Sequence, residues 1–189
     1  MTKPQPSRAV IRGFTLIELI ATIVILAIAL VGVSGMVSLG SSNSANTLLE
    51  TRAIALGESY LDEIMSRRYD ERSDASGLDP CYGLVGVDAC TDEMDFGPDG
   101  GGESSRDRYD DVDDYHEMKE GDGEPNPIRD AEGDTRAEYA NYHVEVTVRY
   151  AGDDPALNRG ETDAKLITVT VTTRDQQEGW KYSVYRGNY

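Results

Sequence analysis

The chain has 189 residues, enough for one modest domain, and its formal charge is −17 at neutral pH. Such acidity argues against a nucleic-acid partner, which requires a basic surface, and it disfavours adhesion to an anionic membrane. It fits a solvated exterior, with basic partners or divalent cations as secondary candidates.

The first predicted element is a hydrophobic helix over residues 14–40, preceded by a short basic segment over residues 1–13. Between Phe14 and Val37, Glu18 is the only charged side chain. About 20 apolar residues suffice to span a bilayer, so this helix can cross the membrane once. A charge at the centre of such a helix costs roughly 2.5–3.5 kcal/mol. Glu18 therefore predicts an opposing charge on a partner.

Three other interpretations of residues 14–40 are weaker. A secretory signal peptide has an apolar region of about 7–15 residues, which is shorter than this one. A generic single-pass anchor fits the length, and Lys3, Arg8 and Arg12 would hold its N-terminus in the cytoplasm. That interpretation leaves Glu18 unexplained. A buried core helix seldom runs so far with so little polarity, because helices of soluble domains usually keep a polar face.

The sequence Gly-Phe-Thr-Leu-Ile-Glu at residues 13–18 resembles the class III signal of type IV prepilins and the related pseudopilins. The resemblance implies that prepilin peptidase cleaves between Gly13 and Phe14 and methylates the new N-terminal residue, Phe14. It also implies that Glu18 is the assembly residue, which pairs with the terminal amine of a neighbouring subunit. Because an α-amine is mostly cationic at neutral pH, the buried amine and the Glu18 carboxylate would compensate each other's charge.

The resemblance implies a structural subunit of a pilus or pseudopilus. Its partners would be prepilin peptidase, other pilin subunits, the pilus assembly platform and the inner membrane, which it would cross once with its C-terminal domain in the periplasm. Within the family, the chain is most similar to minor pilin-like subunits of MSHA-type pili. The alternatives are a type II secretion pseudopilin and a membrane-anchored periplasmic domain that binds or senses a ligand and never polymerises.

An amphipathic helix is predicted to continue over residues 41–66. Apolar side chains recur there at three- and four-residue steps, which places them on one face of the helix. The resemblance to pilins implies that a globular domain docks along this apolar stripe. The stripe consists of Leu49, Ala53, Leu56, Tyr60 and Ile64.

Residues 67–140 show no sustained period, and we expect an irregular region there. The region contains Cys81 and Cys90, the two cysteines of the chain. Export would place them in an oxidising compartment, so a disulfide is the natural prediction. A zinc site is disfavoured because the chain has only two histidines to complete it.

The most acidic stretch lies between Asp88 and Glu124, with 15 acidic and three basic residues. We expect a solvated acidic loop, because blocks of like charge are commonly exposed or disordered. No resident cofactor or metal is predicted. Calcium binding is a weaker prediction than a solvated loop without metal; calcium takes about six to eight oxygen ligands. Its candidate ligands are Asp110, Asp111, Asp113 and Asp114.

Antiparallel strands are predicted over residues 141–189. Residues 141–150 and 165–174 alternate apolar and polar side chains. A shorter third strand is expected over residues 180–186, after a connection at residues 177–179. One apolar face of this meander would pack on the stripe of the amphipathic helix.

Together these elements predict an α+β fold in which a long N-terminal helix, membrane-spanning in its first half, packs on a small antiparallel sheet in the manner of pilins. The chain lacks the paired histidines of a zinc-protease helix, a phosphate-binding glycine loop and a nucleophile elbow. The sequence therefore predicts a structural protein and no enzyme.

Overall fold

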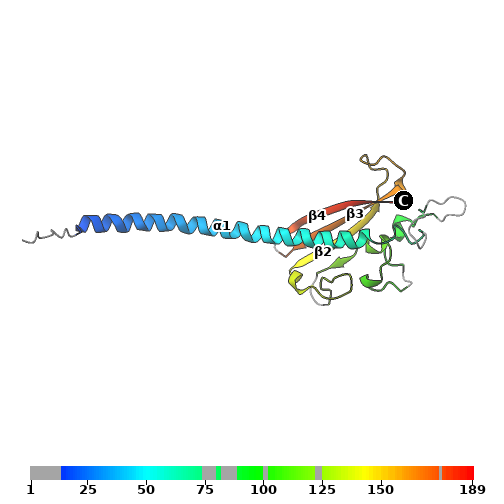
Figure 1. Ribbon diagram of the computed structural model, residues 1–189, viewed down its shortest axis with the longest axis horizontal. Coiled ribbons are helices and arrows are strands. Elements are labelled where there is room, and N and C mark those ends of the chain that lie inside the picture. The colour runs from blue at the N-terminus through cyan, green and yellow to red at the C-terminus, as the bar shows by residue number, and fades with distance from the viewer. Residues whose placement is uncertain (1–13, 74–79, 82–88, 100–101, 122–124, 175) are drawn as a thin grey trace, which may run out of the picture. The chain divides into compact units, whose positions relative to one another are not determined.

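The fold is α+β and pilin-like, with a long helix and a four-stranded antiparallel sheet (Figure 1). The computed structural model describes residues 14–73, 80–81, 89–99, 102–121, 125–174 and 176–189, with no side-chain description for residues 34–45 and 176–178. The elements are α1 (Leu16–Met65), β1 (Lys119–Glu120), β2 (Tyr142–Tyr150), β3 (Ala164–Thr173) and β4 (Gln176–Gly187). The chain divides into two compact units between Leu48 and Leu49.

The first unit carries the apolar half of α1. From Leu16 to Val33 the helix is long and apolar enough to cross a membrane, and none of this stretch is buried within the protein. The hydroxyl of Thr22, within this stretch, donates hydrogen bonds to the backbone carbonyl oxygens of Glu18 and Leu19 at 2.9 and 2.8 Å, so it does not need a partner outside the helix. The surface that this segment presents is therefore almost entirely hydrocarbon.

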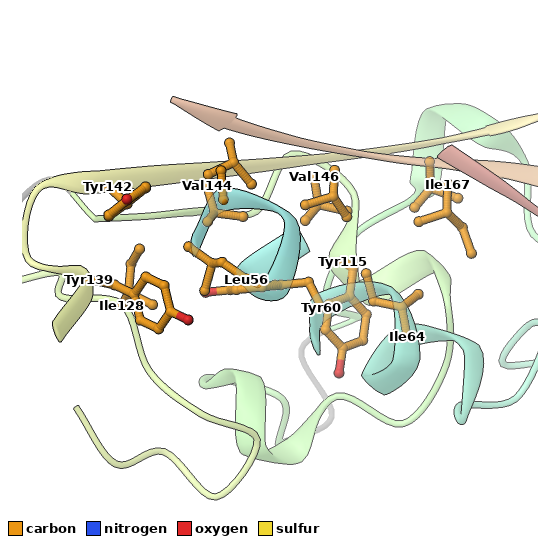
Figure 2. Close-up of a cluster of buried hydrophobic side chains, with 14 of the residues drawn as sticks. Leu56, Tyr60, Ile64, Tyr115, Ile128, Tyr139, Tyr142, Val144, Val146 and Ile167 are labelled. Atoms are coloured by element: carbon orange, nitrogen blue, oxygen red, sulfur yellow. The ribbon is translucent and has the colours of Figure 1, made fainter. Parts of the chain in front are cut away.

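The core of the second unit lies between the second half of α1 and one face of the sheet. Figure 2 shows Leu56, Tyr60 and Ile64 of α1 in one cluster with Val144 and Val146 of β2. All five side chains are buried, and each aliphatic one stabilises the fold by about 1.5–3 kcal/mol. The predicted apolar stripe is confirmed: four of its members are fully buried and the fifth packs at the edge of the core. In chain order these are Leu49 at the edge, then Ala53, Leu56, Tyr60 and Ile64.

The sheet has the order β1-β2-β3-β4, and all neighbours are antiparallel. The alternation predicted for the first two long strands is confirmed, since every second residue of β2 from Tyr142 to Tyr150 is buried, and so are Ile167, Val169 and Val171 of β3. β1 was not foreseen, because a pair of residues is too short to show an alternating pattern.

The third predicted strand was too short, since β4 spans twelve residues rather than residues 180–186. The Gln-Glu-Gly sequence at residues 177–179 lies inside β4 and does not form the connection between strands. Gly179 has a φ of +61°, and the register between β3 and β4 shifts between Val171 and Thr173. Gly179, which suggested a turn in the sequence, therefore occupies a left-handed position in a β-bulge of β4.

Gly57 brings α1 close to β4. A Cβ atom on Gly57 would lie 2.3 Å from Cδ2 of the Tyr182 ring, so no side chain fits there without a shift of the ring. We expect Gly57→Ala to lower the free energy of unfolding by about 1–3 kcal/mol, because overpacking outweighs the helix propensity of alanine. Chemical denaturation of the full chain in detergent measures this. In a Tyr182→Leu background the loss should be smaller, and an equal loss in both backgrounds would contradict the contact.

Candidate functional site

The N-terminal signal lies at the start of α1. Gly13 is outside the described residues, whereas Phe14 is described and 83% exposed. Thr15 precedes the helix, and its Oγ1 accepts a hydrogen bond of 3.4 Å from the backbone N–H of Glu18. Glu18 thereby lies in the first turn, where its carboxylate also interacts favourably with the positive end of the helix dipole. The short Thr-x-x-Glu spacing thus begins the helix and fixes where the charge lies.

Glu18 is an anion within a hydrocarbon surface. Among the residues that the structure describes, no cationic side chain pairs with its carboxylate. The positive end of the helix dipole explains why an acid is tolerated at this end of α1, but this interaction leaves the carboxylate oxygens free for another group. A cation supplied by a second molecule at the level of the first helical turn would compensate this charge once lipid or protein surrounds it.

Cys81 and Cys90 form the predicted disulfide, and both are buried. The amide of Asn188, near the C-terminus, donates a hydrogen bond of 3.0 Å to the carbonyl oxygen of Cys81 and one of 3.2 Å to that of Thr162. The cystine also packs against Tyr69. The cystine therefore joins the start of the acidic stretch, which contains Cys90, to Tyr69 after the end of α1 and to the C-terminal segment.

The expectation of a solvated acidic loop is wrong for the densest part of the acidic stretch. Asp111, Asp113 and Asp114 are 2–3% exposed, and only Asp110 of this run remains exposed. The reason is that Val112 and Tyr115 insert into the hydrophobic core and carry the aspartates between them inward. Backbone N–H groups satisfy part of the charge, since Asp111 Oδ1 accepts hydrogen bonds from the following turn at 2.7 and 3.2 Å.

Lys165 supplies the main opposing charge. Its side chain is fully buried, and its ammonium donates to the carbonyl oxygen of Tyr69 at 2.7 Å, to Asp70 Oδ2 at 3.0 Å and to Asp113 Oδ1. The ammonium lies 4.3 Å from the centroid of the Tyr69 ring and 4.9 Å from that of Phe96. β3 positions Lys165, whereas the segment after α1 and the turn Asp113–Tyr115 position the acids.

The carboxyl groups around Lys165 differ in their protonation. Burial alone would raise the pKa of Asp70, but the Lys165 ammonium and hydrogen bonds from the backbone of Arg72 and Thr91 lower it below its ordinary value. Burial raises the pKa of Asp113 to about 8 despite the same ammonium. The two acids that contact Lys165 therefore differ: Asp70 is an ionised carboxylate, whereas Asp113 is a largely neutral acid near neutral pH.

Three of the four calcium candidates, Asp111, Asp113 and Asp114, border one pocket, whereas Asp110 does not. Asp113 faces the Lys165 ammonium, and Asp110 forms an ion pair with Arg68. Among the described residues, the carboxylates close enough to share an ion are those of Glu71, Glu103 and Asp110, and the first and last of these are exposed. Calcium binding at this region stays a prediction, and the buried lysine already offsets much of the repulsion for which calcium was invoked.

A second buried ionic cluster surrounds Arg106. Its guanidinium pairs with both carboxylate oxygens of Glu63 on α1, and it donates to Glu120 of β1 at 3.1 Å. The same group lies 4.0 Å from the centroid of the Tyr60 ring. Tyr115 adds a hydrogen bond of 2.8 Å to Glu63 Oε1. The cluster joins the acidic region to the helix that carries the N-terminal signal.

Comparisons with known proteins bear on the N-terminal segment alone. Residues 8–34 match the family described as the prokaryotic N-terminal methylation motif. The matched stretch contains Gly13, Phe14 and Glu18 and ends within the apolar half of α1. No curated protein and no solved structure matches the chain.

Proposed function

We propose that this chain, whose N-terminal motif indicates a pilin-like substrate of prepilin peptidase, is a minor structural subunit of a type IV pilus of the MSHA type. It is cleaved between Gly13 and Phe14, methylated at Phe14 and assembled through α1. The observation that carries the proposal is the methylation motif on the exposed apolar stretch of α1 from Leu16 to Val33, in which Glu18 is the one charged side chain. The proposal gives the chain no enzymatic role.

Before assembly, the apolar half of α1 anchors the protein in the inner membrane as a single span. Lys3, Arg8 and Arg12 precede the span, and basic residues favour the cytoplasmic side. The second unit is then periplasmic. The disulfide between Cys81 and Cys90 supports this orientation, because such bonds persist in oxidising compartments.

In the filament, the exposed side chains from Leu16 to Val33 leave lipid and pack against the same segments of other subunits. Removing the leader creates an α-amine on Phe14, four residues before Glu18. When helices pack side by side, the amine of one subunit compensates the carboxylate of its neighbour, and any other register leaves a charge unpaired in an apolar environment. The pair thus selects the register of assembly.

The assignment to an MSHA-type pilus rests on a resemblance to the minor pilin-like protein MshD. The segments that carry the resemblance are residues 60–64, 67–71 and 109–115. In the structure these segments contribute Glu63, which binds Arg106, and the two aspartates that bind Lys165. The resemblance therefore falls on the residues that tie the acidic region to the helix and the sheet.

Co-expression with a prepilin peptidase tests the processing step. The intact mass of the chain should fall by that of residues 1–13 and rise by one methyl group on Phe14. Gly13→Val should leave the full-length chain uncut, whereas Gly32→Val, at a position where a Cβ meets no other atom, should be processed normally. An uncut wild-type chain would favour a membrane-anchored sensing domain. A processed chain that never enters surface pili would point to a secretion pseudopilus.

A further inference from the structure

Lys165, Asp70 and Asp113 form a buried triad in the second unit. Lys165 Nζ is in hydrogen-bond contact with Asp113 Oδ1 and lies 3.0 Å from Asp70 Oδ2, and the lysine is fully buried. We infer that Lys165 and Asp113 condense into an intramolecular isopeptide bond, with Asp70 as the catalytic residue that transfers the protons. This inference does not depend on the proposed function.

Asp113 is the electrophile of the triad. A neutral carboxylic acid is attacked by an amine far more readily than a carboxylate. Burial, together with the neighbouring charges of Asp111 and Asp70, raises the pKa of Asp113 to about 8. Its Oδ2 atom is buried and, among the described residues, accepts no hydrogen bond. Nothing described there stabilises the ionised form at this oxygen, which becomes the departing hydroxyl.

Asp70 is suited to proton transfer. Its Oδ1 accepts hydrogen bonds from the N–H of Arg72 at 3.0 Å and the hydroxyl of Thr91 at 3.0 Å, so the carboxylate is held in one orientation. Its Oδ2 faces the Lys165 ammonium at 3.0 Å. Burial would raise the pKa of Asp70, but this ammonium and hydrogen bonds from the backbone N–H groups of Arg72 and Thr91 lower it, so the group stays ionised with Oδ2 in position to accept a proton of the ammonium.

The surroundings keep water from the Lys165 ammonium, which is fully buried. Three aromatic rings approach Lys165 Nζ, with centroids 4.3, 4.9 and 5.4 Å away. A nucleophilic lysine requires such a desolvated pocket, and holding it against the acid removes most of the entropic barrier to reaction. The rings belong to Tyr69, Phe96 and Tyr150. A pocket of about 170 Å³ bordered by Asp113 gives the released water a place to leave.

The step balances without an external reagent. The Lys165 ammonium passes a proton to Asp70, and the free amine forms a C–N bond with the carboxyl carbon of Asp113. The C–O bond to the Asp113 hydroxyl breaks. Of the three protons on the ammonium, one stays on the amide nitrogen, one leaves with the hydroxyl as water and one remains on Asp70. No atom is oxidised or reduced.

Mass spectrometry of the folded full chain, purified in detergent and then reduced and denatured, tests the inference. The intact mass should be lower than the sequence mass by one water. Protease digestion should release a branched peptide in which the segment containing Asp113 is joined to the segment containing Lys165. Water can also be lost at the Asp-Gly pairs at residues 99–100 and 122–123, so the branched peptide identifies the site.

Substitutions separate the roles. Lys165→Arg keeps the positive charge but removes the amine, and it should restore the full mass. Asp113→Asn should replace the loss of water by a loss of ammonia, because the same attack then expels the amide nitrogen. Asp70→Asn should leave most of the chain uncondensed. Lys119→Arg is the matched control, since Lys119 forms an ion pair of 2.9 Å with Glu145 on the exposed surface and stays uncondensed.

Three outcomes would overturn the inference: a wild-type chain with its full sequence mass, a mass deficit that persists in Lys165→Arg, or a digest in which the two segments are always separate. The first and third are read on the wild-type protein, so they hold even where a variant fails to fold.

Discussion

Glu18→Ala is expected to reduce incorporation of the protein into filaments by about tenfold or more, while its level in the membrane stays unchanged. The substitution removes the carboxylate and leaves the α-amine of a neighbouring subunit without a counter-charge among apolar helices. The apolar surface of α1 from Leu16 to Val33 is retained, so insertion in the membrane is unaffected. Quantitative immunoblots of sheared filaments and of membranes from the same cells measure both quantities.

Two controls distinguish this effect from a general loss of helix stability. Glu18→Gln keeps a hydrogen-bonding side chain without the charge and should be nearly as defective as alanine. Glu50→Ala, on an exposed part of the same helix, should assemble normally. Normal incorporation of Glu18→Ala would remove the assembly role from this carboxylate and leave its interaction with the positive end of the helix dipole as its function.

Arg106→Met is expected to lower the free energy of unfolding by about 3–5 kcal/mol, the usual cost of leaving a buried ion pair with one partner. Arg106 is 8% exposed and contacts Glu63 and Glu120, whose side chains are each 7% exposed. Glu120 would remain in the interior without a cation, and Glu63 would keep only the more distant Arg67, at 3.9 Å. Equilibrium denaturation of the full chain in detergent, followed by tyrosine fluorescence, gives the difference.

Replacing the two acidic partners of Arg106 by uncharged amides is a complementary test of the same cluster. Glu63→Gln together with Glu120→Gln should recover part of the stability lost in Arg106→Met, because uncharged amides cost less to bury. Arg108→Met is the control for loss of a nearby arginine; Arg108 is exposed and should leave the denaturation midpoint nearly unchanged. Equal effects of Arg106→Met and Arg108→Met would show that the cluster adds no stability.

The periodic parts of the fold were predictable from the sequence. The stripe from Leu49 to Ile64 and the alternation of β2 are repeated over many residues, so a single exception cannot hide the pattern. The N-terminal signal was also readable, since six consecutive residues carry it. The length of β4 was underestimated because Gly179 looks like a turn residue when its spatial neighbours are unknown.

The buried ionic clusters were missed because the acidic residues and their basic partners are distant in sequence. Asp70 and Lys165 are 95 residues apart, and Glu63 and Arg106 are 43 apart. A count of charges from Asp88 to Glu124 therefore predicted an exposed loop. One signal was present: Lys165 has the same strand parity as the buried Ile167, which places its charge on the apolar face of β3. A buried lysine requires a carboxylate partner.

The N-terminus of the chain recovered from purified pili tests the central claim most directly. Peptide mass spectrometry should find a chain that begins at Phe14 with a methylated amine, present in smaller amounts than the principal subunit of the same filaments. A chain that begins at Met1, a Phe14 amine without the methyl group, or pili that contain no trace of this protein would contradict the account.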